Sequence, residues 1–315
     1  MNTNTRDHGG GLDAAARQFG GARADWIDLS TGINPVAYPI GTIEFDAWTA
    51  LPDQAAQAAL TDAARIFWDV PPQAAILATP GASAPIAMIP RLREKGRVHI
   101  AAPTYNEHAA AFTAAGWTAT ATRQDADAKV IVHPNNPDGR LFTATDLTAP
   151  LRIIDESFCD VTPAASLIPQ AAAEGTLILK SFGKFWGLAG LRLGFVMGDP
   201  DLVAALAQML GPWPVAGPAL RIGTAALSDP DWATETRNRL TTQSARLDAL
   251  MQGAGAQIIG GTTLFRLYEV DDAARWQTRL ARHHIWSRVF PYNARWLRLG
   301  LPAPHQWPRL EATLA

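Results

Sequence analysis

Lys184 has the surroundings that covalent chemistry by a lysine requires. It follows an apolar segment, Thr176 to Leu179, that is typical of a buried strand, and small and apolar residues come directly after it. A lysine amine can form a Schiff base when it is held near a carbonyl and partly desolvated, because its neutral form then becomes accessible. Ser181 and Arg192 flank Lys184, and a hydroxyl and a guanidinium suit a bound phosphate. A phosphate beside a Schiff-base lysine indicates pyridoxal phosphate.

Two earlier segments carry groups that suit a planar phosphorylated cofactor. Gly81, Ala82 and Ser83 precede an apolar helix, and the free backbone N–H groups of such a turn can bind an anion. The same residues would also serve as an ordinary helix cap. Tyr105 comes shortly after an apolar strand and offers a ring on which a planar cofactor could stack, although aromatic residues at strand ends often belong to the core.

Two polar residues follow further apolar runs. The turn at 134–139 is rich in proline, asparagine and glycine, and it presents Asn136 as a neutral donor suited to a phenolate oxygen. Asp155 ends the run Arg152–Asp155, and a carboxylate at the tip of a buried strand needs a cationic or donor partner. A protonated pyridine nitrogen is such a partner, and the pair strengthens the ring as an electron sink. The alternative is that Asp155 caps the segment after it.

The composition is that of a compact enzyme. The chain has 315 residues, of which 48% are hydrophobic and 18% charged, with a formal net charge of −2. It has no basic block, no zinc-ligand spacing and a single cysteine, so we expect no nucleic-acid partner, no metal and no internal disulfide. We find no signal-peptide core and no run of about 20 apolar residues, which predicts a cytoplasmic protein without membrane contact.

The elements that must position these residues alternate along the chain. From about Ala50 to Met209, short apolar runs alternate with helical patterns, which predicts an α/β fold with a mostly parallel central sheet covered by helices. Chemistry in such sheets gathers at the carboxyl ends of the strands. The expected strands are Val98–Ala101, Lys129–His133, Arg152–Asp155, Thr176–Leu179 and Leu193–Met197, and the expected helices are Asp53–Phe67, Ala84–Arg93, Glu107–Ala115 and Asp201–Met209.

The pattern changes after the proline-rich stretch at 211–214. A long charged helix is expected over Asp231–Met251, followed by short strands and helices typical of a smaller α+β lobe. The N-terminal segment has a strand of its own, expected at Trp26–Leu29, which we expect to join this lobe. We therefore predict a large domain over 44–210 and a small domain formed by 1–43 and 211–315.

Taken in order and spacing, these residues resemble the pyridoxal-phosphate enzymes of the aspartate-aminotransferase superfamily, fold type I. The resemblance spans nearly the whole chain and is carried by Gly81-Ala82-Ser83, Tyr105, Asn136-Pro137-Asp138-Gly139, Asp155, Ser181, Lys184, Arg192 and Arg298. It implies that Lys184 forms the Schiff base and moves protons, that Asp155 holds the pyridine nitrogen and that Tyr105 stacks on the ring. It further implies that Asn136 meets the O3′ oxygen, that the phosphate is held by Gly81, Ala82, Ser83, Ser181 and Arg192, and that the enzyme is a homodimer.

Within the superfamily, the chain resembles the branch that contains histidinol-phosphate aminotransferases and threonine-phosphate decarboxylases. The segments that carry this resemblance are His8-Gly9-Gly10, Gly32-Ile33-Asn34-Pro35 and Pro212-Trp213-Pro214-Val215, and the first of them favours the decarboxylases. The resemblance implies that the substrate is bound by His8, Gly9, Asn34, Asn136, Arg288 and Arg298. Two guanidiniums suit a substrate with both a carboxylate and a phosphate, since each planar fork binds oxygens in pairs.

The implied reaction is the decarboxylation of L-threonine O-3-phosphate to (R)-1-amino-2-propanol O-2-phosphate in cobalamin biosynthesis. Residue types alone also leave open a histidinol-phosphate-type aminotransferase and a non-catalytic nucleotide-binding protein, so the choice of decarboxylation rests on the resemblance. Two positions depart from the family pattern: Phe158 replaces a tyrosine common in the superfamily, and the tyrosine that usually reaches the partner subunit's cofactor is replaced near Ala55–Ala56.

Overall fold

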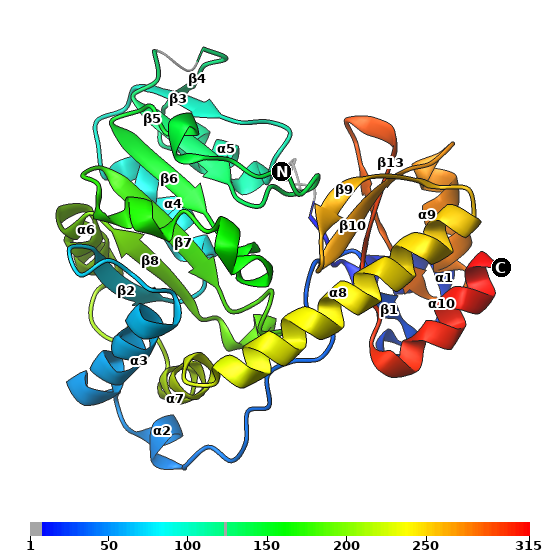
Figure 1. Ribbon diagram of the computed structural model, residues 1–315, viewed down its shortest axis with the longest axis horizontal. Helices are drawn as coiled ribbons and strands as arrows, with labels where there is room; N and C mark the ends of the chain where they lie inside the picture. The colour runs from blue at the N-terminus through cyan, green and yellow to red at the C-terminus, as the bar shows by residue number, and fades with distance from the viewer. Residues whose placement is uncertain (1–7, 123–124) are drawn as a thin grey trace. The chain divides into compact units, whose positions relative to one another are not determined.

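The computed structural model describes residues 8–122 and 125–315, and the chain forms two compact units (Figure 1). The large unit comprises Ala37–Asn136 and Arg140–Thr234. The small unit comprises Met1–Val36, Pro137–Gly139 and Glu235–Ala315. Among the described residues, every helix is too short or too polar to span a lipid bilayer.

The large unit is built on a 7-stranded sheet with the strand order β2-β8-β7-β6-β5-β3-β4 (Figure 1). The strands are β2 (Ala75–Thr79), β3 (Arg97–Ile100), β4 (Thr118–Ala119), β5 (Ala128–Val132), β6 (Leu151–Asp155), β7 (Thr176–Ser181) and β8 (Gly194–Gly198). Neighbouring strands from β7 to β4 are parallel, whereas β8 runs antiparallel to both β2 and β7. The predicted α/β fold with a mostly parallel sheet is confirmed.

Continuous apolar runs explain why the central strands lie where they do. All residues of β5 are buried, and so are the residues of β7 except the last. Strands of this kind must be covered on both faces. The helices of this unit are α2 (Asp46–Thr49), α3 (Gln54–Phe67), α4 (Ser83–Met88), α5 (Asn106–Ala114), α6 (Pro200–Leu210) and α7 (Gly217–Leu227). Residues of α4, α5 and α6 pack with the strands into one core that includes Ile86, Phe112, Ile153, Leu177 and Leu206.

The small unit contains a 4-stranded antiparallel sheet with the order β12-β13-β10-β9. Its strands are β9 (Gln257–Thr262), β10 (Phe265–Glu269), β12 (Arg288–Phe290) and β13 (Asn293–Gly300), and its helices are α1 (Leu12–Phe19), α9 (Ala273–Ala281) and α10 (Trp307–Leu314). The long helix α8 (Pro230–Gly253) contributes residues to both units. The N-terminal strand β1 (Ile27–Asp28) pairs in parallel with β11 (Ile285–Trp286), which joins the N-terminal segment to the C-terminal part.

The division into units differs from the predicted domain boundaries. Residues 37–43 and 211–234, which we assigned to the small domain, belong to the large unit. The reason is α7, a helix that the sequence analysis did not anticipate. A Cβ atom at Gly217 would lie 2.2 Å from the carbonyl oxygen of Ala47, and one at Gly223 would lie 2.8 Å from Leu60, so α7 packs closely against α2 and α3. Conversely, the amide of Gly261 donates to the oxygen of Asp138 at 2.8 Å, which joins Pro137–Gly139 to the small unit.

Candidate active site

The parallel strands bring the predicted cofactor residues to one edge of the large sheet. Asp155 is the last residue of β6 and Ser181 the last of β7, while Asn136 and Tyr105 follow β5 and β3. The end of β2 reaches the same edge, because Thr79 and Ser181 both pair with Gly194, the first residue of β8. These residues therefore lie at the carboxyl ends of the parallel strands, where ligands bind in sheets of this kind.

The groups predicted to hold a phosphate meet beside Gly194. A Cβ atom at Gly81 would lie 2.5 Å from Nη2 of Arg192, and one at Gly194 would lie 2.7 Å from the amide nitrogen of Ala82. Glycine at position 81 thus lets the guanidinium approach the turn of Gly81–Ser83, and glycine at position 194 lets the backbone of β8 approach the same turn. The Arg192 backbone is left-handed with φ 54°, and its Nη1 donates to the oxygen of Ala189 at 3.1 Å. Because α4 is short, Arg192 and the hydroxyls and amides around it are the groups that could hold an anion here.

Asp155 is a buried carboxylate with hydrogen-bonding partners at both of its oxygens. Its side chain is 3% exposed, and its Oδ2 lies 2.8 Å from Nε2 of His108. Its Oδ1 accepts hydrogen bonds from the hydroxyl of Ser157 at 2.5 Å and from the amide of Ser157 at 3.0 Å. Burial raises the pKa of Asp155, but the hydrogen bond and charge of His108 and the bonds from Ser157 outweigh it, so this pKa is lowered. Asp155 therefore presents a permanent negative charge near neutral pH.

Neither His108 nor Asn135 was among the residues predicted for the site. His108 lies three residues after Tyr105 at the start of α5, so the two side chains share one face of the helix, and their rings meet edge to face at 6.2 Å. That spacing was the signal available in the sequence. Asn135 is fully buried, donates to the oxygen of Pro103 at 2.9 Å and accepts from the hydroxyl of Thr104 at 2.6 Å. It ties the turn that carries Asn136 to the loop that carries Tyr105.

Lys184 lies in a turn after β7 that aromatic packing holds rigid. Its Nζ is 5.3 Å from the centre of the Phe158 ring, and the lysine is half-buried. The ring of Trp186 stacks on Phe182 at 5.1 Å and on Trp232 at 5.3 Å. An amine beside an apolar ring is partly desolvated, as the proposed chemistry of Lys184 requires. Phe158 therefore contributes an apolar wall where the family pattern has a phenol.

A second buried ion cluster lies next to the site residues in sequence. Nζ of Lys180 is 2.7 Å from Oε2 of Glu156 and 3.2 Å from Oδ1 of Asp160. The indole nitrogens of Trp68 and Trp186 donate to Asp160 at 2.9 and 3.2 Å. Burial lowers the pKa of Lys180, but the two carboxylates outweigh it and raise that pKa above its ordinary value. One buried cation thus faces two carboxylates, and the indole donors of Trp68 and Trp186 help to stabilise the remaining negative charge.

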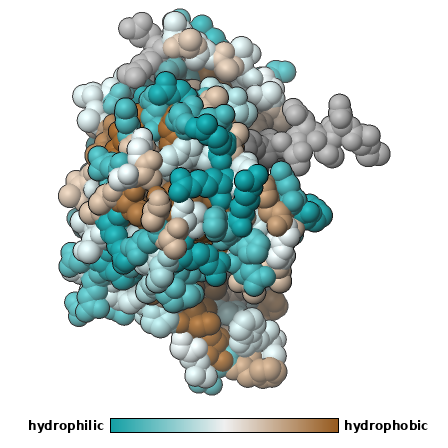
Figure 2. Space-filling view, turned by 90° about the vertical axis from the view of Figure 1, so that its right-hand side faces the viewer, coloured by the Kyte–Doolittle hydropathy of each residue, from teal (hydrophilic) through white to brown (hydrophobic). Residues whose placement is uncertain are grey.

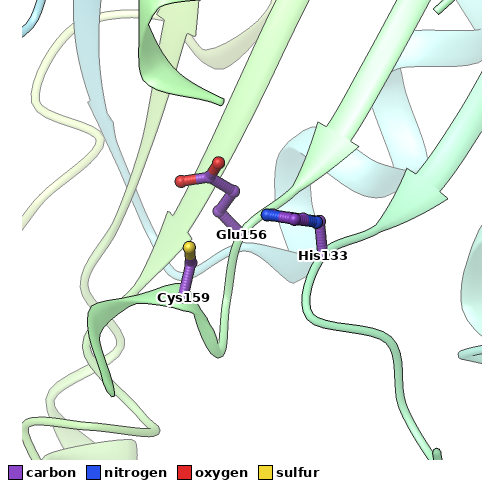
Figure 3. Close-up of side chains that lie close together, drawn as sticks. All are labelled: His133, Glu156 and Cys159. Atoms are coloured by element: carbon purple, nitrogen blue, oxygen red, sulfur yellow. The ribbon is translucent and has the colours of Figure 1, made fainter. Parts of the chain in front are cut away.

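His133, Glu156 and Cys159 lie within metal-binding distance of one another, as Figure 3 shows, but their ligand atoms have other partners. Nε2 of His133 lies 2.7 Å from the carbonyl oxygen of Ala165, and its Nδ1 accepts from the amide of Phe142. A carbonyl only accepts, so His133 carries its proton on Nε2 and both ring nitrogens are used. Burial and Glu156 raise the pKa of the Cys159 thiol. We interpret this cluster as a structural one.

The small unit contains all the residues predicted to bind substrate except Asn136. Arg288 and Arg298 are direct cross-strand partners on β12 and β13, so their side chains lie on the same face. Arg298 is 5% exposed and donates to the oxygen of Ser30 at 2.6 Å, and Arg288 donates to the oxygen of His8 at 2.5 Å. A Cβ atom at Gly9 would lie 2.5 Å from the Ser30 oxygen. Two like charges placed opposite each other destabilise a sheet unless an anion compensates them.

The comparisons with known proteins agree with this geometry. The profile of the family "Aminotransferase class I and II" matches residues 24–311. The chain belongs to this family. It is 41% identical to a threonine-phosphate decarboxylase from Sinorhizobium sp over 93% of this chain and 92% of that protein. It is 38% identical to a threonine-phosphate decarboxylase from Pseudomonas aeruginosa over 98% of this chain and 97% of that one.

A solved structure of a family member has the same fold. The crystal structure of histidinol-phosphate aminotransferase from Sinorhizobium meliloti in complex with pyridoxal-5'-phosphate superposes with a TM-score of 0.84 and 19% identity. The match covers 97% of this chain and 93% of that one. Fold type I and its arrangement of strands are therefore established for this chain.

Removing the charge of Lys180 should destabilise the large unit severely. In Lys180→Met, Glu156 and Asp160 would remain buried without a cation, and we expect a loss of about 3–5 kcal/mol in the free energy of unfolding. Urea denaturation followed by circular dichroism measures this loss. Arg246→Met is the control, because it breaks an exposed pair with Glu311 and should cost about 1 kcal/mol or less. Equal losses in both variants would contradict the interpretation.

Proposed function

We propose that this protein uses pyridoxal phosphate to decarboxylate L-threonine O-3-phosphate, giving (R)-1-amino-2-propanol O-2-phosphate for cobalamin biosynthesis. The observation that carries the proposal is the similarity, over nearly the full chain, to two proteins named threonine-phosphate decarboxylase. The facing pair of Arg288 and Arg298 supports it, because a substrate with two anionic groups matches two neighbouring guanidiniums.

The residues of the large unit fit the cofactor. A carboxylate that stays ionised while buried suits a protonated pyridine nitrogen, and the glycine at position 81 lets the Arg192 guanidinium, a suitable phosphate ligand, lie against the turn. When bound, pyridoxal phosphate supplies an aldehyde that bonds to amines and a ring that accepts electrons from the substrate carbon. Asp155 would hold the ring nitrogen, Tyr105 would stack, Asn136 would meet O3′, and the phosphate would be held by Gly81, Ala82, Ser83, Ser181 and Arg192.

The chain's own groups then have distinct tasks. Nζ of Lys184 would bond to the cofactor aldehyde and carry protons to and from the substrate carbon, and the apolar ring of Phe158 limits its solvation. His8, Gly9, Asn34, Asn136, Arg288 and Arg298 would bind the substrate. If guanidiniums hold the substrate phosphate, they leave the carboxylate without a fixed partner, so that it could depart as carbon dioxide.

We further propose that the protein is a homodimer. Several large apolar side chains of the large unit are exposed: Ile40, Phe45, Trp48, Leu51, Ile66 and Trp213. Phe45 is 78% and Trp48 65% exposed although both lie at α2, which packs on α7. Figure 2 shows a hydrophobic patch, bordered by residues of intermediate hydropathy, at the lower end of the visible face. Exposed apolar patches of this kind mark protein–protein interfaces, and the partner we propose is a second copy of this chain.

The function is tested by incubating the purified holoenzyme with L-threonine O-3-phosphate. We expect carbon dioxide release without any 2-oxoglutarate, whereas amino-group transfer without gas release would indicate an aminotransferase and reject the proposal.

Lys184→Ala should remain folded and lose activity by at least several orders of magnitude, because it removes the covalent amine. Mass spectrometry after borohydride reduction should locate the cofactor on Lys184 in the wild type. An adduct at another residue would refute the assignment.

Arg288→Met should weaken substrate binding while leaving the cofactor in place. Loss of one guanidinium from an anion site typically removes about 2–5 kcal/mol, which predicts a rise in KM of roughly 30-fold or more. The control is Arg295→Met on β13, where an exposed arginine pairs with Glu269 at 2.8 Å. An unchanged KM in Arg288→Met would exclude Arg288 from the substrate site.

The dimer is tested with Trp48→Lys, which places a charge in the proposed interface. We expect the wild type to sediment as a dimer at micromolar concentration and the variant to dissociate at least about 30-fold more readily, since buried interface tryptophans contribute about 2 kcal/mol or more. Ile259→Lys, at a position on β9 that is 41% exposed, should leave the dimer intact. A monomeric wild type, or equal behaviour of both variants, would contradict this interface.

A further inference from the structure

Arg239 is a half-buried arginine of α8 whose side chain reaches the loop predicted to bind substrate. Its Nη2 donates to Oδ1 of Asn34 at 3.1 Å, and its Nη1 donates to Oε1 of Gln243, one helical turn on, at 3.4 Å. All three residues belong to the small unit. Within the described residues no carboxylate forms a salt bridge with Arg239, unlike Arg246 and Arg266, which pair with Glu311 and Asp248.

A half-buried arginine without a salt bridge to a carboxylate carries an energetic cost. Burial lowers the pKa of Arg239, which reflects the cost of desolvating its charge. A substitution by an apolar residue of similar length would avoid that cost, so the structure points to a task for the guanidinium. The contact with Asn34 supplies one.

The guanidinium determines which way the Asn34 amide faces. Arginine has only donors, so it can meet Asn34 only through Oδ1. The same oxygen accepts the amide hydrogen of Val36 at 3.1 Å, and Asn34 is 2% exposed. Two donors on Oδ1 hold the amide in one of its two flipped orientations, with the Nδ2 hydrogens on the opposite side. In the other orientation Asn34 would present an acceptor oxygen where it now presents donors.

The loop that carries Asn34 is held by arginines at two points. Arg298 donates to the oxygen of Ser30, four residues before Asn34, and Arg239 holds Asn34 itself. The amide of Gly300 donates to the oxygen of Leu29 at 2.7 Å, which fixes the start of the loop to β13. Arg298 and Arg239 thus approach the same short loop from a strand and from a helix.

We propose that Arg239 is a positioning residue for substrate recognition: it orients the Asn34 amide so that Nδ2 donates to an anionic oxygen of the substrate. The inference rests on the proposed function, in which Asn34 binds an anionic group of a phosphorylated amino acid. Arg239 itself need not touch the substrate. Substrates without an anion at that position gain nothing from the arrangement, so Arg239 contributes to selectivity as well as to affinity.

The test is a cycle of Arg239→Met, Asn34→Ala and the double variant, each loaded with cofactor. We expect Arg239→Met to raise KM for L-threonine O-3-phosphate by roughly 10-fold, the effect of one hydrogen bond to a charged group, with kcat within about 3-fold. In the Asn34→Ala background the same substitution should leave KM unchanged. Arg239→Lys, which keeps a donor-only cation, should recover most of the affinity.

Controls separate positioning from a general loss of structure. Arg246→Met removes an arginine from the same helix and should leave KM unaltered. Asn34→Asp keeps acceptor oxygens for Arg239 and Val36 but loses the Nδ2 donors, so it should fold like the wild type and still bind substrate weakly. Melting temperatures of all variants, followed by circular dichroism, report on folding independently of substrate.

The outcomes distinguish this inference from the proposed function. Wild-type KM in Arg239→Met, an equal rise in both backgrounds, or a loss confined to kcat would overturn the role of Arg239 alone. Calorimetric titration of the same variants with L-threonine O-3-phosphate adds a binding measurement that does not require turnover. If the wild type neither releases carbon dioxide nor binds this compound, both proposals fall together.

Discussion

A buried, ionised carboxylate is the constraint around which the large unit is arranged. Asp155 lies at the end of a central strand, where an unpaired charge would be prohibitively costly. His108 and Ser157 surround it with donors, and they keep its pKa low in spite of burial. The result is a permanent negative charge at the edge of the sheet where β3, β5, β6 and β7 end. Such a charge suits a cationic ring nitrogen, the ligand that we propose for Asp155.

A second set of charged residues is adjacent to the site residues in the sequence, but its side chains point to the other side of the strands. Asp155 and Glu156 are consecutive, as are Lys180 and Ser181, and consecutive residues of extended chain point to opposite sides. Glu156 and Lys180 meet each other and Asp160 in the interior. Asp155 and Ser181 are thereby left for the site. The buried lysine of β7 is structural, whereas the half-buried Lys184, beside the ring of Phe158, has the surroundings of a reactive amine.

The small unit contains the two arginines that we propose as ligands for the substrate anions, although their like charges repel each other. Arg288 and Arg298 face each other across two strands, and each is restrained by a backbone carbonyl, of His8 and of Ser30. Preorganised guanidiniums lose little freedom on binding, which favours a rigid, doubly charged substrate. The orientation of Asn34 by Arg239 follows the same principle, since a neutral amide becomes a selective donor only when its flip is fixed.

The amino-acid order by itself determined the fold class and the acidic strand end, because both depend on local pattern: apolar runs define buried strands, and a charged residue at the end of such a run is recognisable in the sequence. It also predicts Lys184 as the reactive amine, whereas the substrate role of Arg288 and Arg298 was inferred from the family resemblance, and only the tertiary structure shows that they pair across β12 and β13. The tertiary structure alone decided that His108 supports Asp155, that Asn135 joins two loops, that α7 belongs to the large unit and that Arg239 meets Asn34. These contacts join residues whose partners are chosen by packing: the spacing from Tyr105 places His108 near the site, but no local spacing specifies its contact with Asp155. Arg239 and Asn34 are 205 positions apart, and only the folded chain brings their side chains within a hydrogen bond.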